Sequence, residues 1–171
     1  MPNTQQSTDA IVLLKADHKE IRKLFADFEK AGDSAQATKK RLVDKIIELL
    51  TVHTYIENEV MYPRVRALLP ELEDDVLESY EEHHVADVLI NELAAMRASD
   101  ERFTAKATVL IENVRHHMTE EEDEWFPKVR EALGRNQLQE IGARMLEAKK
   151  KAPRSPAQPS ALKKAIDAVI K

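Results

Sequence analysis

The chain contains no cysteine, which excludes disulfides, thiolate nucleophiles, iron–sulfur clusters and cysteine-ligated zinc. Glycine is scarce, with three residues in 171, and aromatic residues make up only 5%. No apolar run approaches the roughly 18 residues that a membrane span needs. The first ten residues are polar and lack the apolar segment of a signal peptide. We therefore expect a cytoplasmic protein that does not associate with a membrane.

Charged residues are plentiful but unevenly spread. They make up 33% of the chain and apolar residues 43%, which is typical of a single soluble domain. The net charge is −5, yet the stretch from Lys149 to Lys171 carries seven basic residues against the single acid Asp167. Because the rest is strongly acidic, we do not expect a nucleic-acid partner. For the basic tail we favour a solubilising role, or contact with the acidic body, over binding to nucleic acid or anionic lipid.

Apolar residues recur with helical spacing, and no segment alternates in the way of a strand. The spacing predicts four long helices and one shorter one. The first helix follows the cap candidates Ser7 to Asp9, and the second follows Asp33 and Ser34 and extends to Pro63. The third helix runs from Glu73 to about residue 98. The fourth helix follows Ser99 and Asp100 and extends to Pro127, and the short helix covers Gln137 to Lys149. Short connections favour an all-α, up-down-up-down four-helix bundle.

The predicted organisation is a bundle over residues 1–150 and a proline-containing basic tail over residues 151–171. Pro153, Pro156 and Pro159 indicate a linker within the tail. The residues from 162 to 170 form a candidate short amphipathic helix. A turn at residues 134–136 separates the fourth long helix from the short one.

One motif occurs twice in the chain. His53 and Glu57 are followed by Tyr62-Pro63, and His117 and Glu121 are followed by Phe126-Pro127, so each copy has the form His-x3-Glu-x4-aromatic-Pro. Residues four apart lie on one face of a helix, which makes each His–Glu pair a ready pair of metal ligands. Pairs of this kind on facing helices build dinuclear sites in carboxylate-bridged bundle proteins.

A further histidine precedes each copy at almost the same distance. His18 lies 35 residues before His53, and His83 lies 34 residues before His117. In antiparallel helices this spacing brings each pair to a similar height. The candidate metal ligands are His18, His53, Glu57, His83, His117 and Glu121. This mixed nitrogen and oxygen set suits iron or manganese and could also take zinc.

The neighbouring pair His116 and Glu120 has the same spacing, but the repeat aligns only through His117. The same alignment favours His83 over the adjacent His84 as the ligand. Tyr80 lies one turn before His83 and is the best-placed extra ligand, ahead of Tyr55 and His84. For both tyrosines we favour core packing or a hydrogen bond to a ligand.

The order and spacing of these residues over about 9–133 resemble the hemerythrin-like HHE cation-binding domain. The resemblance implies a four-helix bundle with a non-heme di-iron centre, oxo- or hydroxo-bridged, whose two carboxylates bridge the irons. It implies binding, sensing or redox turnover of dioxygen, peroxide or nitric oxide. Oxygen-carrying hemerythrins have a further histidine on the third helix, where this chain has Asp87 and Val88.

An iron site with fewer protein ligands leaves positions for water or a small molecule. We therefore favour peroxide-type turnover, catalase-like or peroxidase-like, over oxygen carriage, in a protein of oxidative stress. The alternative is a non-catalytic sensor of iron or oxygen, or an iron-binding protein. A bundle that holds zinc, or no metal, is the third interpretation.

Overall fold

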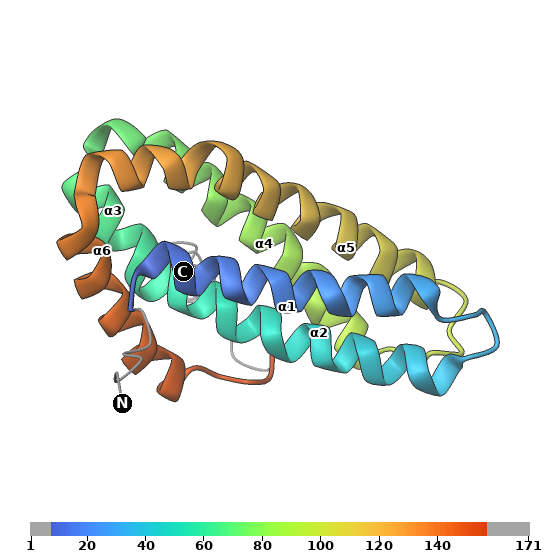
Figure 1. Cartoon of the computed structure of the whole chain (residues 1–171). Helices are drawn as coiled ribbons and strands as arrows, with labels where there is room; N and C mark the ends of the chain where they lie inside the picture. The colour runs from blue at the N-terminus through green and yellow to red at the C-terminus, as the bar shows by residue number, and fades with distance from the viewer. Residues whose placement is uncertain (1–7, 157–171) are drawn as a thin grey trace, which may run out of the picture.

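The computed structural model describes residues 8–156, and over this range the chain is helical with no β-strand. Four long helices form the bundle: α1 (Ala10–Lys30), α2 (Gln36–Ile56), α4 (Glu73–Ala95) and α5 (Phe103–Glu120). α1 packs against α2, and α4 packs against α5, so two antiparallel hairpins lie together (Figure 1). The predicted all-α, up-down-up-down bundle is confirmed.

Each hairpin ends in a widened helical turn. The π-helical turn Glu57–Met61 joins α2 to α3 (Tyr62–Leu68), and the π-helical turn Glu121–Trp125 joins α5 to α6 (Phe126–Lys151). The sequence predicts that Pro63 kinks or ends its helix. In the structure Pro63 lies in the first turn of α3, where its missing N–H removes little hydrogen bonding. A 3-10 turn, Pro70–Leu72, leads into α4.

The first two helix starts show one correct cap prediction and one wrong one. Asp9 caps α1, because its carboxylate accepts a hydrogen bond from the Val12 N–H at 3.1 Å. Asp33 and Ser34 do not cap α2. The capping position is Ala35, which makes no side-chain hydrogen bond, because a turn closed by the Ala35 N–H delays the helix.

The connection between α4 and α5 also differs from the prediction. α4 ends at Ala95, before residue 98, and α5 begins at Phe103 with no side-chain cap from Ser99 or Asp100. The Asp100 carboxylate instead accepts a hydrogen bond from the Arg97 N–H at 2.6 Å. That bond stabilises the turn after α4, so the carboxylate is not available to α5.

α6 changes direction at Gly134, whose φ of 74° lies in the left-handed region that favours glycine. Beyond this break, the predicted short C-terminal helix folds back across one end of the bundle and contacts α1 and α2 (Figure 1). Its buried side chains include Leu138, Ile141 and Met145. The candidate helix over 162–170 lies outside the described residues, and the domain boundary at residue 150 stays a prediction.

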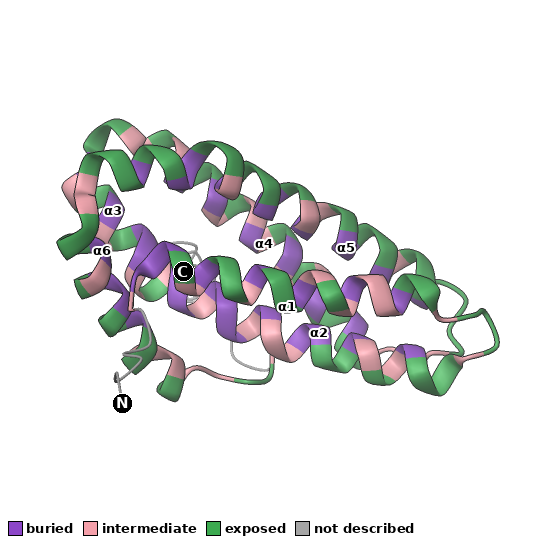
Figure 2. Cartoon of the chain, viewed as in Figure 1, coloured by how far each residue is buried: buried purple, intermediate pink, exposed green. Residues whose placement is uncertain are grey.

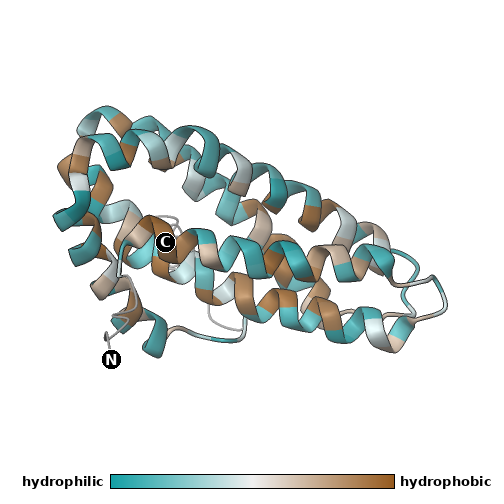
Figure 3. Cartoon of the chain, viewed as in Figure 1, coloured by the Kyte–Doolittle hydropathy of each residue, from teal (hydrophilic) through white to brown (hydrophobic). Residues whose placement is uncertain are grey.

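Buried residues face the inside of the bundle and exposed ones face outward (Figure 2), and the apolar residues follow the same inner faces (Figure 3). The core consists of two apolar clusters, one around Phe25 and Phe103 and the other around Tyr62 and Phe126. α1, α2 and α4 contribute apolar residues to both clusters. α5 contributes to the first cluster, and the π-helical turn that follows it contributes Trp125 to the second. Between the clusters lies a layer of buried polar residues. No described helix is both long enough and apolar enough to cross a membrane.

Candidate metal centre

The buried polar layer contains every predicted ligand, each at most 6% exposed. The four long helices and the two π-helical turns supply them, in the order His18 from α1, His53 from α2, Glu57, His83 from α4, His117 from α5 and Glu121. Each glutamate is the first residue of its π-helical turn. Such turns within α-helices are frequent at functional sites.

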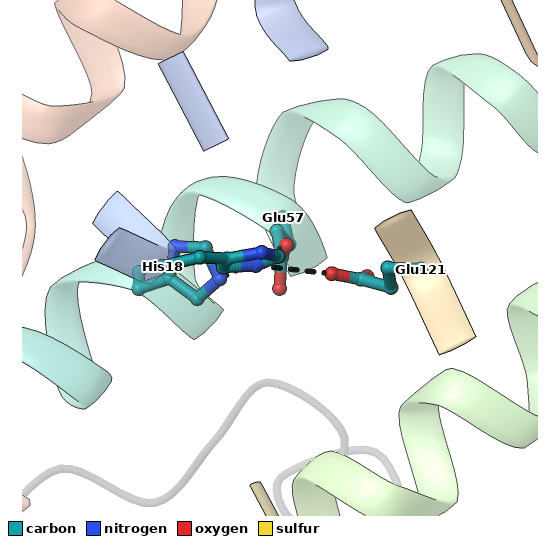
Figure 4. Close-up of side chains that lie close together, drawn as sticks. His18, Glu57 and Glu121 are labelled. Atoms are coloured by element: carbon teal, nitrogen blue, oxygen red, sulfur yellow. Dashed lines mark ion pairs between the residues drawn. The ribbon is translucent and has the colours of Figure 1, made fainter. Parts of the chain in front are cut away.

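The first half-site consists of His18 and His53 with one oxygen from each glutamate. His18 Nε2 lies 3.3 Å from Glu121 Oε2, and His53 Nε2 lies 3.1 Å from Glu57 Oε1. Figure 4 shows His18 facing Glu121, with Glu57 beside them. All four of these buried atoms lack a hydrogen-bond partner of acceptable geometry. Buried polar atoms are almost always satisfied, so their convergence indicates a shared ligand.

The second half-site consists of His83 and His117 with the other oxygen of each glutamate. His83 Nε2 lies 3.2 Å from Glu57 Oε2, and His117 Nε2 lies 3.3 Å from Glu121 Oε1. The two imidazole Nε2 atoms are 3.1 Å apart. Each glutamate therefore presents one oxygen to each half-site, which is the arrangement that two bridged cations require.

Tyr62 is a site residue that the sequence analysis did not identify. Its hydroxyl donates to Glu121 Oε1 at 2.6 Å and lies 3.3 Å from Glu57 Oε2. It is also 3.3 Å from Nε2 of His83 and from Nε2 of His117. The phenol oxygen thus lies among all four ligand atoms of the second half-site. The signal in the sequence is the aromatic residue of the repeated motif, which is a phenol in one copy only.

Tyr80, ranked first as an extra ligand, is not the tyrosine that reaches the centre. Its ring packs edge-on against Tyr62, with ring centroids 5.5 Å apart. Tyr55 packs at the edge of the apolar cluster around Tyr62, and His84 is only partly buried, in neither of the buried ligand groups. The predicted register on α5 matches the burial, because His116 has an exposed side chain and pairs with Glu120 at 3.1 Å.

The two half-sites are chemically inequivalent. Phe126 occupies the repeat position of Tyr62, and its ring stacks on His18 with centroids 5.8 Å apart. The first half-site therefore has an apolar cover where the second has a phenol. The repeat makes two similar halves, and at this repeat position a single hydroxyl distinguishes them.

Four further side chains orient the imidazoles through Nδ1, and the sequence analysis missed them. His18 contacts Glu122 at 2.7 Å, His53 contacts Asp17 at 3.3 Å, His83 contacts Asn58 at 2.8 Å, and His117 contacts Glu82. An Nδ1–H held by an oxygen leaves Nε2 free to bind a metal, and the acceptor strengthens the imidazole as a donor.

These acceptors follow the repeat. Asp17 and Glu82 each stand one residue before the first histidine of a pair, while Asn58 and Glu122 each stand one residue after a motif glutamate. Their positions relative to the ligands were therefore readable from the sequence. The pairing was not, because Asn58 and Glu122 each contact a histidine of the opposite repeat.

The model of the hemerythrin HHE cation-binding domain matches residues 9–129. The chain belongs to the hemerythrin HHE family. A solved hemerythrin HHE cation-binding domain-containing protein from Mycobacterium kansasii is similar in fold, with a TM-score of 0.65 and 22% identity. That likeness covers 84% of this chain and 88% of the other.

A curated relative, a DNA nickase from Nostoc sp., is 27% identical over 139 residues. The aligned part is 81% of this chain but only 38% of that relative. The family establishes a cation-binding domain for which iron is the expected metal.

The hemerythrin-family ligands stabilise one another's charges. Burial lowers the pKa of His53, but Glu57 and Asp17 outweigh burial and raise this pKa to about 10. Burial and the charge of Glu121 raise the pKa of Glu57, but His53 and His83 outweigh both and bring it to about 2. Burial and the two carboxylates raise the pKa of the Tyr62 hydroxyl well above its usual value. A metal cation that binds here takes the place of the histidine protons.

A cavity of about 100 Å³ lies beside the second half-site, between α4 and the segment that runs from α5 into α6. Its inner wall includes His117, Glu121 and Trp125. Carboxylates dominate the remaining wall, which consists of Asp75, Glu78, Ser79, Glu82, Glu120, Glu124 and Lys128. Dioxygen, peroxide and nitric oxide are small enough for this space, which reaches the half-site that holds Tyr62.

Proposed function

We propose that this hemerythrin-family chain holds a non-heme di-iron centre, one iron in each half-site, with Glu57 and Glu121 as bridges. The observation that carries this proposal is the convergence of four buried, unpartnered ligand atoms in the first half-site. Imidazole nitrogens and carboxylate oxygens form a donor set that suits iron. Bound iron would supply electron exchange between ferrous and ferric states.

The protein residues enclose this centre and leave one side of it accessible. The two apolar clusters lie on either side of the polar layer. The cavity of about 100 Å³ has room for small molecules and reaches His117 and Glu121 of the second half-site. The Tyr62 hydroxyl donates a hydrogen bond to Glu121 Oε1 and keeps its proton, so a proton is held beside the position where a small oxygen species would bind.

We propose peroxide turnover as the reaction, of the catalase-like or peroxidase-like kind. In the catalase reaction, two peroxide molecules give one dioxygen and two water molecules, and no outside electron donor is needed. A centre that is open on one side, has a proton donor beside it and lacks the third-helix histidine of oxygen carriers is suited to turnover. These features support turnover over reversible oxygen carriage.

Purified protein loaded with ferrous iron is expected to hold about two iron atoms per chain, because the half-sites share both carboxylates. Elemental analysis and an oxo-bridge absorption band check the number and the pairing. An oxygen electrode should then record dioxygen release on addition of peroxide. One tightly bound iron, or none, would overturn the dinuclear centre.

A non-catalytic sensor of iron or oxygen is the alternative. It predicts a centre that binds dioxygen or nitric oxide and changes the stability of the chain, without dioxygen release from peroxide. Melting temperatures measured with and without nitric oxide, beside the electrode assay, distinguish the two functions.

Tyr62→Phe is expected to keep the iron, because His83, His117 and both glutamates remain at that half-site. Because the variant lacks the proton that Tyr62 holds beside the second half-site, we expect its peroxide turnover to fall by about 10²-fold, within the range that one proton donor contributes. Tyr80→Phe is the matched control, since it removes a hydroxyl from the neighbouring tyrosine, whose ring packs edge-on against that of Tyr62. If Tyr62→Phe retains the wild-type rate, as Tyr80→Phe should, Tyr62 is not the proton donor.

The name of the nickase describes a protein of which this chain matches a minor part. We propose no DNA chemistry from it, and the prediction that nucleic acid is not a partner stands on the acidic composition. The cytoplasmic location also stays a prediction. No protein partner is proposed.

A further inference from the structure

The second half of α6 lies outside the internal repeat, yet it reaches the metal centre. Lys149 Nζ donates to Asp17 Oδ1 at 2.8 Å, and the other oxygen of Asp17 lies 3.3 Å from Nδ1 of His53. A continuous chain of contacts thus runs from α6 through α1 to a predicted metal ligand on α2. Asp17 is mostly buried, while the Lys149 side chain is partly exposed.

Close backbone packing holds this part of α6 in place. A Cβ atom added to Gly142 would lie 1.5 Å from the carbonyl oxygen of Thr8, just before α1. Only glycine permits this approach. Before the break at Gly134, the Arg130 guanidinium of α6 also pairs with Asp9, the cap of α1. The start of α1 and the second half of α6 therefore form one packed unit that aims Lys149 at Asp17.

Cations support only the first half-site in this way. Glu122, which contacts His18, is paired with Arg22 at 2.7 Å, just as Asp17 is paired with Lys149. At the second half-site, His83 contacts the neutral amide of Asn58. His117 contacts Glu82, which has no lysine or arginine within ion-pair distance among the described residues. The repeat therefore keeps the oxygen acceptors but not the cations behind them.

We propose that the second half of α6 is part of the metal centre, and that Lys149, acting through Asp17, sets how strongly His53 donates to the metal of the first half-site. A carboxylate that accepts from Nδ1–H makes the imidazole a stronger donor, and a stronger donor stabilises the ferric state. The ammonium group 2.8 Å away draws charge from the same carboxylate and opposes this effect. Lys149 is a positioning residue that favours the ferrous state of one iron. The inference rests on the di-iron centre proposed above.

Lys149→Gln in the full-length, iron-loaded protein tests this. We expect unchanged iron content and an iron of the first half-site that is about tenfold harder to reduce, the lower end of outer-ligand effects. Tenfold corresponds to about 59 mV for a one-electron step, measurable by potentiometric titration followed optically. The potential should move to more negative values. Lys149→Arg keeps the cation and should return the potential toward that of wild type.

Lys150→Gln is the matched control, because it removes the same charge from the neighbouring position, where Lys150 is exposed and pairs with Glu147. Equal potentials for Lys149→Gln and Lys150→Gln would overturn the inference, as would a failure of Lys149→Arg to restore the wild-type value. Wild-type protein without an iron pair would overturn the proposed function itself. An intact pair with no response to Lys149→Gln would overturn this inference alone.

Discussion

Glu121→Ala and Glu57→Ala are each expected to abolish stable binding of the iron pair, with an affinity loss of more than about 100-fold. Changing a residue that only hydrogen-bonds to a metal ligand lowers metal affinity by roughly 10- to 100-fold. Each glutamate here contributes an oxygen to both half-sites. Removing one carboxylate also removes a negative charge that offsets two cations. Iron content after gel filtration and the oxo-bridge absorption band measure the loss.

His18→Ala is expected to be milder, because it removes one terminal nitrogen from one half-site, and water can fill the position. Glu120→Ala should keep both irons, since Glu120 pairs with His116 at the surface. The comparison of Glu120→Ala with Glu121→Ala tests the register of α5 directly. Loss of iron in Glu120→Ala, with full iron in Glu121→Ala, would show that the wrong carboxylate has been assigned.

The bundle and the gathering of the predicted ligands could be read from the sequence for a simple reason. Helical periodicity puts His53 and Glu57 on one face, and matched spacing brings His18 to the same height. Both statements depend only on regular α-helical geometry. The ligands lie on regular helices up to the two glutamates, so the extrapolation holds as far as Glu57 and Glu121.

Tyr62 could not be placed in the same way, because the helix is not regular where it matters. Tyr62 follows Glu57 by five residues, and in an α-helix a residue five positions on points toward a different face. The π-helical turn widens the backbone to an i to i+5 hydrogen-bond pattern, which returns position five to the face of Glu57. The same turn after Glu121 brings Phe126 over His18. Periodicity analysis assumes the α-helical repeat and so misses both aromatic residues.

The contacts between the two repeats, and those with α6, could not be predicted from the sequence for a different reason. That Glu122 serves His18, and that Lys149 reaches Asp17, depends on how helices distant in sequence are packed. No local pattern encodes these pairings. The direction of the second half of α6 is set by the left-handed backbone of Gly134. The sequence predicts a turn at this position but not the direction of the helix that follows it.

Removal of the metal is expected to lower the melting temperature by roughly 10 °C. A ligand present at about 1,000 times its dissociation constant stabilises the folded state by about 4 kcal/mol. For a chain of this size each kcal/mol corresponds to about 2–4 °C. Thermal unfolding before and after chelation measures the shift. Equal melting temperatures for the two forms would contradict a buried metal centre.

The folding stability of the iron-free protein should depend on pH differently from that of the iron-loaded protein. In iron-free protein, the protonated His53 stabilises the folded state because its pKa is raised by folding. This stabilisation is fully present below pH 6.5 and is lost as pH rises toward about 10. The lowered pKa of Glu57 contributes stability above pH 4.5, and this is lost as pH falls toward about 2. The contribution of this pair is therefore greatest between about pH 4.5 and 6.5, as denaturant titrations over this range can show.

Iron should move the pH of maximum folding stability upward. The metal replaces the histidine protons, and protons compete less with the metal for the imidazoles as pH rises. Loading at pH 7 is expected to release protons from His53 and from His117, whose pKa is also raised despite burial, by Glu121 and Glu82. A pH indicator in weakly buffered solution records this release. Loading without proton release, or an optimum that stays below pH 6.5 with iron bound, would show that the metal lies elsewhere than on these histidines.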